Sequence, residues 1–318
     1  MTESRRPVVY SPEQGTWLSF HGIPSRIVAN GDETDGNYCV SVGTSLPGGQ
    51  APPHSHPFAE GFWILSGKMQ FTAGNESLEL EEGGYLHLDG GVAHFPRNLS
   101  DTETELITFC FPSGFEAFQK EVSVEVPDGN GPFPKAPEGT EQRMKEIGPK
   151  YGIDLDPAPE EFEKPPSIRV QSPGEGATIG VVGDVYRFLV TGADTEGQYA
   201  LWHATIYPQG GPPPHRHSRE EEFFYVLSGE VMIYDDGEGL LAKPGTAVNL
   251  PKGTRHWFKN ESTEPAEMLI LVAPAGLEDM FWETGKPWET AKGAPGPPPA
   301  EEIAKLKEIA PRYGITLG

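Results

Sequence analysis

The sequence contains one long segment twice, and this repeat constrains the fold more than any other feature. Gly31–Tyr38 recurs in similar form as Gly192–Tyr199, and matching positions along the chain are 161 or 162 residues apart. A solenoid repeat is about 20 to 50 residues long, whereas a period of roughly 160 residues is the length of a complete domain. The 318 residues therefore predict two copies of one domain, which we place at residues 1–163 and 164–318.

Each copy has the pattern of antiparallel β-structure. Short apolar stretches such as Phe62–Leu65 and Met69–Ala73 are separated by Gly, Pro, Asn or Asp at hairpin spacing. Gly (39) and Pro (33) are abundant, which favours turns and short strands over long helices. The runs Glu105–Phe111 and Glu267–Ala273 have the length of strands buried in a barrel or sandwich. We expect an all-β fold.

Helix is predicted only near the end of each copy. Glu301–Ala310 places its apolar side chains on one face and ends before Pro311, as a short amphipathic helix does. Val126–Gly139 and Gly285–Pro299 are rich in Pro and Gly and lack periodicity, so we expect loops there.

Charge and composition exclude several classes of partner. The net charge of −23 repels phosphate backbones and anionic lipids, so we expect neither a nucleic acid nor a membrane as partner. No apolar stretch is long enough for a signal peptide or a spanning helix, and Cys39 and Cys110 lie in apolar runs where buried thiols are typical. These features predict a cytoplasmic protein, and the sign of the charge says nothing about a substrate. They leave the oligomeric state open, a homodimer included.

Histidine and glutamate residues with the spacing of a metal site occur once in each copy. Two histidines at positions i and i+2 of a strand point to the same face, so a His-x-His pair presents two imidazoles to one ion. A third histidine follows 38 or 39 residues later, a separation that a returning strand closes, and six of the nine histidines belong to this repeated pattern. The candidate metal ligands are His54, His56, Glu60 and His94 in the first copy and His215, His217, Glu222 and His256 in the second.

This set of ligands indicates a class of metal and a kind of site. Three neutral imidazoles and one carboxylate suit a divalent first-row ion such as Fe, Mn, Ni, Co, Cu or Zn, and they leave one or two coordination positions open. An open position distinguishes a catalytic site from a structural one. We therefore expect one catalytic-type metal centre in each domain, with the identity of the metal left open.

These two motifs, in the same order in both copies, resemble those of the cupin superfamily, and the duplication resembles a bicupin. The resemblance implies two tandem cupin barrels of the double-stranded β-helix or jelly-roll type, with short helices at the end of each half and a metal ion at each centre. Among bicupins, the layout is similar to that of bacterial quercetin 2,3-dioxygenases. The similarity includes Gly114–Phe118 and Gly276–Phe281, segments that would close each barrel.

The resemblance to quercetinases implies a metal-dependent dioxygenase that cleaves the ring of a flavonol or a related enolisable aromatic. Its co-substrate would be O2 and its metal Fe, Mn, Ni, Co or Cu. The flavonol would bind through its 3-hydroxyl, and the carboxylate of Glu60 or Glu222 would accept that proton as the catalytic base. Two positions depart from the family pattern: three residues rather than four separate His56 from Glu60, and Asp89 replaces a Pro.

Apolar side chains are expected to form the substrate pocket. The sequence places no Lys or Arg just before either His-x-His pair, and strand alternation points Arg97 and Arg255 away from the metal. A planar aromatic fits such walls better than oxalate, the substrate of another bicupin class, which needs a cation. The predicted pocket residues are Phe62, Ile64, Phe71, Phe224 and Val226.

Two other functions stay open at this point. One is a different metal-dependent bicupin enzyme, an oxygenase or isomerase of natural-product metabolism. The other is a non-catalytic binding bicupin that contains metal. Within the leading hypothesis, aromatic side chains are denser near the first site, which favours the N-terminal centre as the catalytic one; they are Phe58, Phe62, Trp63, Phe71 and Phe95.

Overall fold

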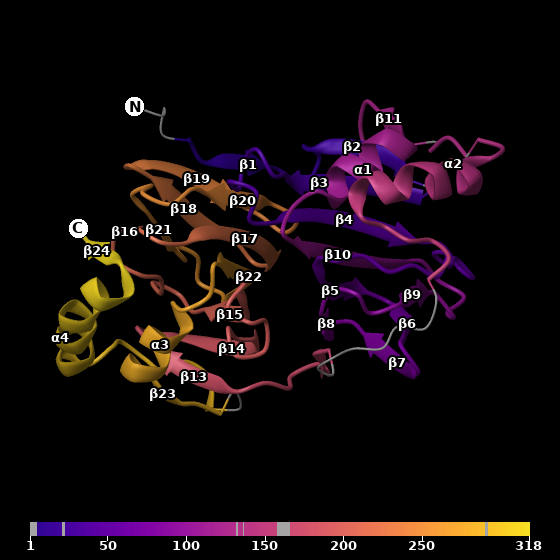
Figure 1. The fold of residues 1–318 in the computed structure, drawn as a ribbon. Coiled ribbons are helices and arrows are strands. Elements are labelled where there is room, and N and C mark those ends of the chain that lie inside the picture. Colours follow the sequence, from indigo (N-terminus) through magenta and orange to yellow (C-terminus); the bar gives the residue numbers. More distant parts are fainter. Residues whose placement is uncertain (1–4, 21–22, 132, 136, 158–165, 290–291) are drawn as a thin grey trace. The chain divides into compact units, whose positions relative to one another are not determined.

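The computed structural model of the chain consists of two compact units. It describes all residues except 1–4, 21–22, 132, 136, 158–165 and 290–291. The N-terminal unit comprises residues 13–174, and the C-terminal unit comprises residues 175–318 together with residues 1–12 (Figure 1). The predicted boundary between residues 163 and 164 lies outside the described residues. The units differ from the predicted 1–163 and 164–318 in two short segments, each of which contributes an edge strand.

The N-terminal unit contains two antiparallel sheets. The larger sheet has the strand order β11-β2-β3-β4-β10-β5-β8-β12 and the smaller one β7-β6-β9. The edge strand β12 pairs with β8, with Ile168 opposite Leu88, and this pairing places residues beyond 165 in the N-terminal unit. The bounds are β2 Thr16–Phe20, β3 Ile23–Ala29, β4 Cys39–Ser45, β5 Ala59–Ser66, β6 Lys68–Ala73, β7 Glu76–Glu81, β8 Tyr85–Leu88, β9 His94–Arg97, β10 Thr104–Phe111, β11 Val124–Val126 and β12 Ile168–Gln171.

The C-terminal unit repeats this arrangement. Its larger sheet has the order β1-β20-β17-β22-β15-β14-β13-β23, and its smaller sheet β19-β18-β21-β16-β24. Here the edge strand comes from the start of the chain, because β1 pairs with β20 and Val8 lies opposite Asn249. The bounds are β1 Val8–Tyr10, β13 Thr178–Val181, β14 Asp184–Val190, β15 Ala200–Ile206, β16 His215–His217, β17 Glu221–Ser228, β18 Val231–Asp235, β19 Glu238–Ala242, β20 Ala247–Leu250, β21 His256–Lys259, β22 Ala266–Ala273, β23 Lys286–Pro287 and β24 Ile315–Leu317.

Equivalent strands of the two units pair in the same register. In the N-terminal unit Ser41 of β4 lies opposite Thr108 of β10. In the C-terminal unit Trp202 of β15 lies opposite Ile270 of β22, and these residues occupy the repeat-equivalent positions. The fold is therefore duplicated position by position, as the sequence repeat predicts, and equivalent side chains of the two units can be compared directly.

Short helices follow the last long strand of each unit, as predicted. The predicted helix Glu301–Ala310 is confirmed as α4, and the 3-10 turn after it contains Pro311. The segments Val126–Gly139 and Gly285–Pro299 contain, among their described residues, only the end of β11 and the short β23 as strands. The helix bounds are α1 Phe115–Val122, α2 Thr140–Ile147, η1 Gly148–Tyr151, α3 Glu278–Thr284, α4 Ala300–Ile309 and η3 Ala310–Tyr313. None of the helices in the described part of the chain is long and apolar enough to cross a membrane.

A buried glutamate fixes the first helix of each unit. In the N-terminal unit Glu116 accepts hydrogen bonds from the backbone N–H groups of Gly31 and Gly114, at 2.9 and 2.7 Å. Glu278 accepts the equivalent pair of bonds in the C-terminal unit. Charge-assisted bonds of this kind are stronger than neutral ones. They hold α1 beside β2 and β4 (Figure 1), where its side chains help to line a cavity described below.

Candidate metal centres

The first four-residue cluster lies in the N-terminal unit, where β5 and β9 approach the His-x-His segment. The ligand atoms of His54, His56, Glu60 and His94 all lie within 4.8 Å of one another. His54 and His94 exchange two backbone hydrogen bonds, with N···O distances of 3.1 and 2.8 Å, as antiparallel neighbours do. Gly91 has a φ of 90° and donates to the carbonyl of His56 at 2.7 Å, which closes the turn before His94.

The second cluster lies at the equivalent place in the C-terminal unit. The ligand atoms of His215, His217, Glu222 and His256 also lie within 4.8 Å of one another, and all four residues are buried. β16 and β21 pair through His215 and His256. Gly253 has a φ of 88° and donates to the carbonyl of His217 at 2.7 Å, so the same turn brings in the third histidine. The structure thus brings together all eight candidate ligands as two groups of four.

Backbone carbonyls orient most of the imidazole rings. Four of the six histidines donate their Nδ1–H to the carbonyl two residues earlier: His54 to Pro52 at 2.8 Å, His94 to Val92 at 2.8 Å, His215 to Pro213 at 2.9 Å and His256 to Thr254 at 3.1 Å. A carbonyl oxygen only accepts, so Nδ1 carries the proton and Nε2 keeps its lone pair. Each ring therefore presents the nitrogen that a metal ion requires, held in place by a second partner.

The donor atoms fit one divalent cation in each unit. Glu60 Oε2 lies 3.0 Å from His56 Nε2 and 2.9 Å from His94 Nε2. In the C-terminal unit, His215 Nε2 and His217 Nε2 are 3.0 Å apart. Atoms that keep their lone pairs repel one another at these distances unless positive charge lies among them. A buried set of three imidazoles and one carboxylate is a suitable site for a borderline transition metal, as the spacing in the sequence predicts.

At His54, His215 and Glu60, the surroundings favour the protonation state that binds metal. Burial, together with the nearby imidazole of His94, lowers the pKa of His54 to about 3. Burial also lowers the pKa of His215 to about 3, together with the other two histidines. Burial alone would raise the pKa of Glu60, but its close contacts with the imidazoles of His56 and His94 bring that pKa below the usual glutamate value. Neutral imidazole and ionised carboxylate are the forms that coordinate a cation.

The two centres differ at one position beside the carboxylate. The second motif has one more residue between histidine and glutamate, so that Glu220 takes the place of Phe58. His56 donates Nδ1–H to the carbonyl of Phe58 at 2.9 Å and stacks on its ring, with centroids 3.7 Å apart. His217 Nδ1 instead lies 3.3 Å from the buried carboxylate of Glu220. Burial would lower the pKa of His217, but Glu222 and Glu220 raise it to about 9.

Sequence reasoning missed Glu220 as a functional residue. The signal in the sequence was the longer spacing of the second motif, which contains a run of three glutamates at 220–222. A carboxylate that accepts from Nδ1 makes an imidazole a stronger metal ligand than a carbonyl does. The C-terminal centre therefore has the stronger support for its metal.

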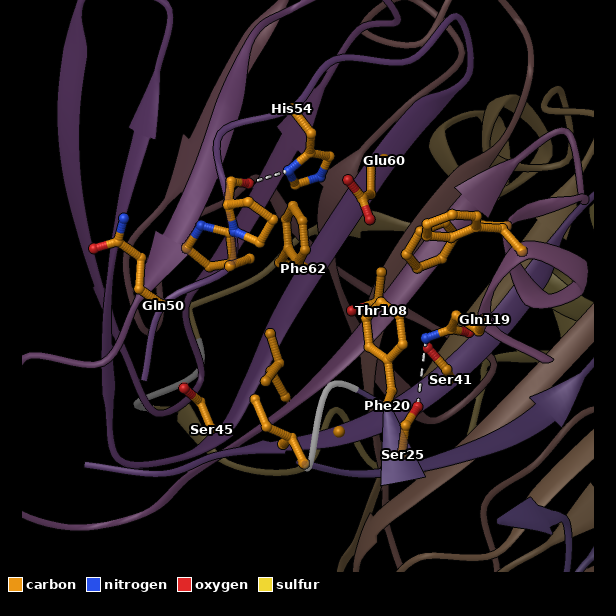
Figure 2. Close-up of a pocket in the computed structure, with 18 of the residues that line it drawn as sticks. Phe20, Ser25, Ser41, Ser45, Gln50, His54, Glu60, Phe62, Thr108 and Gln119 are labelled. Carbon is orange, nitrogen blue, oxygen red and sulfur yellow. Dashed lines mark hydrogen bonds between the residues drawn. The ribbon is translucent and has the colours of Figure 1, made fainter. Parts of the chain in front are cut away.

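The N-terminal centre borders a cavity of about 160 Å³. Figure 2 shows His54 and Glu60 toward one end of this cavity, Phe62 beside them, and the Ser25–Gln119 hydrogen bond toward the other end. Most of the remaining wall is apolar and comes from both sides, with Met69 from the small sheet and Phe118 from α1 among the lining residues. A bound small molecule would thus meet two of the candidate metal ligands directly.

The structure places one predicted pocket residue in a cavity wall and the other four in the hydrophobic cores. Phe62 lines the N-terminal cavity, but Ile64 and Phe71 are fully buried in the hydrophobic core and are not among the described lining residues. The rings of Phe71 and Phe62 pack together, with centroids 4.8 Å apart. Alternate residues of a strand face the same side, so the residues of these strands that lie beyond the cavity are buried between the sheets. Phe224 and Val226 likewise belong to the core of the C-terminal unit.

The C-terminal centre has far less space beside it. Its cavity has a volume of about 50 Å³. Three aromatic rings occupy this region, with centroid distances of 6.0 Å for Tyr186–Trp202, 5.1 Å for Tyr186–Phe281 and 5.5 Å for Trp202–Phe281. The repeat-equivalent residues of the N-terminal unit are the much smaller Ser25, Ser41 and Gln119. The larger side chains at these three positions of the C-terminal unit contribute to the difference in volume.

Neither cavity contains a Lys or Arg among its described lining residues. Arg97 is exposed at the end of β9, and Arg255 lies over the ring of Trp257 at 5.0 Å. The expectation that both arginines point away from the centres agrees with these positions. Among the residues that the structure describes, neither cavity thus offers a cation that would hold a small dicarboxylate.

The fold and the two sites resemble those of a bicupin, a protein with two cupin barrels. The cupin domain family matches residues 42–110 and 202–272, one region in each unit. Solved structures with the same fold include procruciferin, an 11S globulin from Brassica napus, with a TM-score of 0.57 and 10% identity over 86% of each chain. A Bacillus subtilis oxalate decarboxylase mutant has a TM-score of 0.56 and 18% identity, and the match covers 87% of this chain and 79% of that one.

Among proteins of known name, the chain resembles quercetin 2,3-dioxygenase of Bacillus subtilis (strain 168). The two are 22% identical over 302 residues, which are 91% of this chain and 89% of the dioxygenase. A shorter match links the chain to polyketide synthase CurC of Streptomyces cyaneus, at 32% identity over 94 residues, 29% of this chain and 60% of that protein. These similarities and the two His/Glu clusters together indicate a metal-dependent cupin enzyme.

Proposed function

We propose that this chain is a dioxygenase that cleaves the ring of a flavonol or a related enolisable aromatic, and that the N-terminal centre is catalytic. The observation that carries the proposal is the cavity of about 160 Å³ bordered by His54 and Glu60. Three aromatic rings take up the equivalent space beside the C-terminal centre. The resemblance to quercetin 2,3-dioxygenase along most of the chain supports the reaction class.

The residues at the N-terminal centre have three roles in this proposal: metal binding, proton acceptance and packing against the substrate. His54, His56, Glu60 and His94 hold a divalent metal, which would polarise an oxygen atom of the substrate as a Lewis acid. Glu60 borders the cavity, so its carboxylate is placed to accept the proton of a hydroxyl group that enters from there. The apolar wall, Phe62 included, packs against the ring and excludes water.

The proposal is tested with metal-free protein that is loaded anaerobically with Fe, Mn, Ni, Co or Cu in separate samples. Quercetin and O2 are then added, and the loss of the flavonol and the release of carbon monoxide are measured. We expect one carbon monoxide for each flavonol consumed with at least one of the metals. Neither flavonol loss nor carbon monoxide with any of the five would contradict the proposal.

A second candidate is an oxygenase or isomerase that acts on a smaller enolisable ring. It is favoured by the cavity volume of about 160 Å³, because a cavity of about 150 Å³ holds a single benzene ring. The partial match to polyketide synthase CurC also supports natural-product metabolism. Replacing quercetin by the one-ring pyranone kojic acid in the same assay separates the two candidates, because each predicts turnover of its own probe.

A further inference from the structure

Four polar residues lie side by side in the wall of the N-terminal cavity. Ser41 of β4 and Thr108 of β10 are opposite one another, and Ser25 of β3 lies diagonally from Ser41, opposite Gly43. Gln119 reaches in from α1 and donates Nε2–H to Ser25 Oγ at 3.4 Å (Figure 2). All four line the cavity that His54 and Glu60 also border.

These side chains retain unused hydrogen-bonding capacity. In the described part of the chain, the hydroxyl groups of Ser41 and Thr108 form no hydrogen bond, and Gln119 uses only one of its amide N–H groups. Ser25, Ser41 and Gln119 are 5%, 7% and 4% exposed, so bulk water reaches them poorly. Buried polar groups of proteins are almost always paired, which means that these groups need a partner inside the cavity.

The barrel itself does not require polar residues at these places. The equivalent positions of the C-terminal unit hold Tyr186, Trp202, Ile270 and Phe281, which pack as part of its core cluster or against it. The same strands in the same register thus accept large side chains that pack in the core, although the indole Nε1–H of Trp202 is buried there without a hydrogen-bond partner among the described residues. Because this polar set lies beside the centre with the larger cavity, we connect its role with what that cavity binds.

We propose that Ser25, Ser41, Thr108 and Gln119 form a polar subsite that binds a second oxygen function of the substrate, a hydroxyl or carbonyl group away from the metal-binding oxygen. This inference rests on the proposed function and narrows its substrate class to aromatics that carry oxygen groups at two separate places. The absence of Lys and Arg among the described lining residues makes the group neutral rather than a carboxylate.

The test is a binding measurement on the metal-loaded protein without oxygen. Two probe pairs are titrated by calorimetry: quercetin against 3-hydroxyflavone, which lacks the additional hydroxyls, and kojic acid against allomaltol, which lacks one. A neutral hydrogen bond contributes about 0.5–1.5 kcal/mol, so each bond to the subsite should tighten binding about threefold to tenfold. We expect the more hydroxylated member of at least one pair to bind more tightly by that factor.

The variant Ser25→Ala/Ser41→Ala should reduce this ratio of dissociation constants to near one. Ser77→Ala, the same substitution on exposed β7, is the matched control and should leave the ratio unchanged. Equal binding within both pairs, a ratio that survives in the double variant, or no binding of any probe would overturn the subsite. Tight, selective binding without turnover would instead uphold the subsite and contradict the proposed dioxygenase.

Discussion

The two metal centres share their ligands and differ in the space beside them and in one neighbouring carboxylate. Each has three histidines and one glutamate with ligand atoms within 4.8 Å of one another. The N-terminal centre borders a cavity of about 160 Å³, whereas the cavity beside the C-terminal centre measures about 50 Å³. The comparison teaches that the ligand motif identifies a metal site, but side chains on other strands decide whether a substrate can reach it.

The second difference concerns the support of the metal rather than access to it. Phe58 and Glu220 occupy equivalent positions, and only Glu220 offers a carboxylate to a ligand histidine, at 3.3 Å. The C-terminal centre, which has the smaller cavity, thus has the stronger hydrogen-bond partner for a ligand imidazole, that of His217. This arrangement suits a division of roles in which one metal is exposed to substrate and the other is held firmly.

Filling the N-terminal cavity should have the largest effect. Ser41→Trp/Gln119→Phe gives the N-terminal unit the side chains of the C-terminal unit at two positions, so the aromatic substrate loses its space. We expect its binding to weaken more than about 100-fold, the cost of about 3 kcal/mol that overpacking typically imposes. Metal analysis should still find two metal ions per chain. Ser77→Trp on exposed β7 is the control, and unchanged substrate affinity in the double variant would contradict the account.

Removing the carboxylate of Glu220 should have a smaller effect, a loss of metal affinity that is confined to the C-terminal centre. Loss of a second partner of a metal-bound histidine typically weakens metal affinity about 10-fold to 100-fold. Glu220→Gln should therefore release the C-terminal metal to a chelator at lower concentrations, while the N-terminal metal is unaffected. Glu230→Gln, at an exposed ion pair with Lys243, serves as the matched control. Equal weakening of both centres would show that the two are not supported differently.

For one histidine and one pH unit, the pH dependence of the metal-free protein should give the smallest change in free energy. The pKa of His54 and of His215 is lowered to about 3, so the unfolded chain binds protons that the folded one does not. The free energy of unfolding should thus fall as the pH drops below about 6.5, by up to about 1.4 kcal/mol per pH unit for each histidine. Urea unfolding at several pH values measures this, and a free energy that is constant between pH 7 and pH 4 would contradict it.

The C-terminal unit should also lose stability at alkaline pH. The pKa of His217 is raised to about 9, so its stabilising contribution is complete below the unfolded value near 6.5 and disappears as the pH rises through about 9. His217→Gln removes this alkaline loss from the same urea measurements. Identical alkaline profiles for the variant and the parent protein would show that His217 is not the group responsible.

The sequence predicted the features that depend on local spacing. The duplication, the strands, helix α4 and the two groups of four ligands all follow from repeats or from residues close together in the chain. His94 lies far along the chain from the other three ligands, but Gly91 just before it and the same spacing in the second copy indicated a strand that returns to the site. Motif and period therefore gave a correct view of the barrels and of where the ligands meet.

The cavity could not be predicted in the same way, because it depends on side chains that meet only in the folded barrel. Ser25, Ser41 and Gln119 belong to β3, β4 and α1, and no short motif links them. We favoured the N-terminal centre for its dense aromatic side chains, yet Phe71 lies in the core and the open space comes from small residues. The sequence did contain one signal for the difference between the cavities: the first copy has Ser41 where the second has the much larger Trp202.

The central claim is that the N-terminal centre alone is catalytic, and paired histidine variants test it most directly. His54→Ala and His215→Ala each remove one ligand from one centre, and turnover of quercetin with O2 is measured for both after metal loading. The account predicts that His54→Ala loses turnover by more than about 1,000-fold, while His215→Ala stays within about threefold of the parent protein, since removing a metal centre abolishes its chemistry. Loss of turnover in His215→Ala alone, with the C-terminal unit still folded, would contradict it.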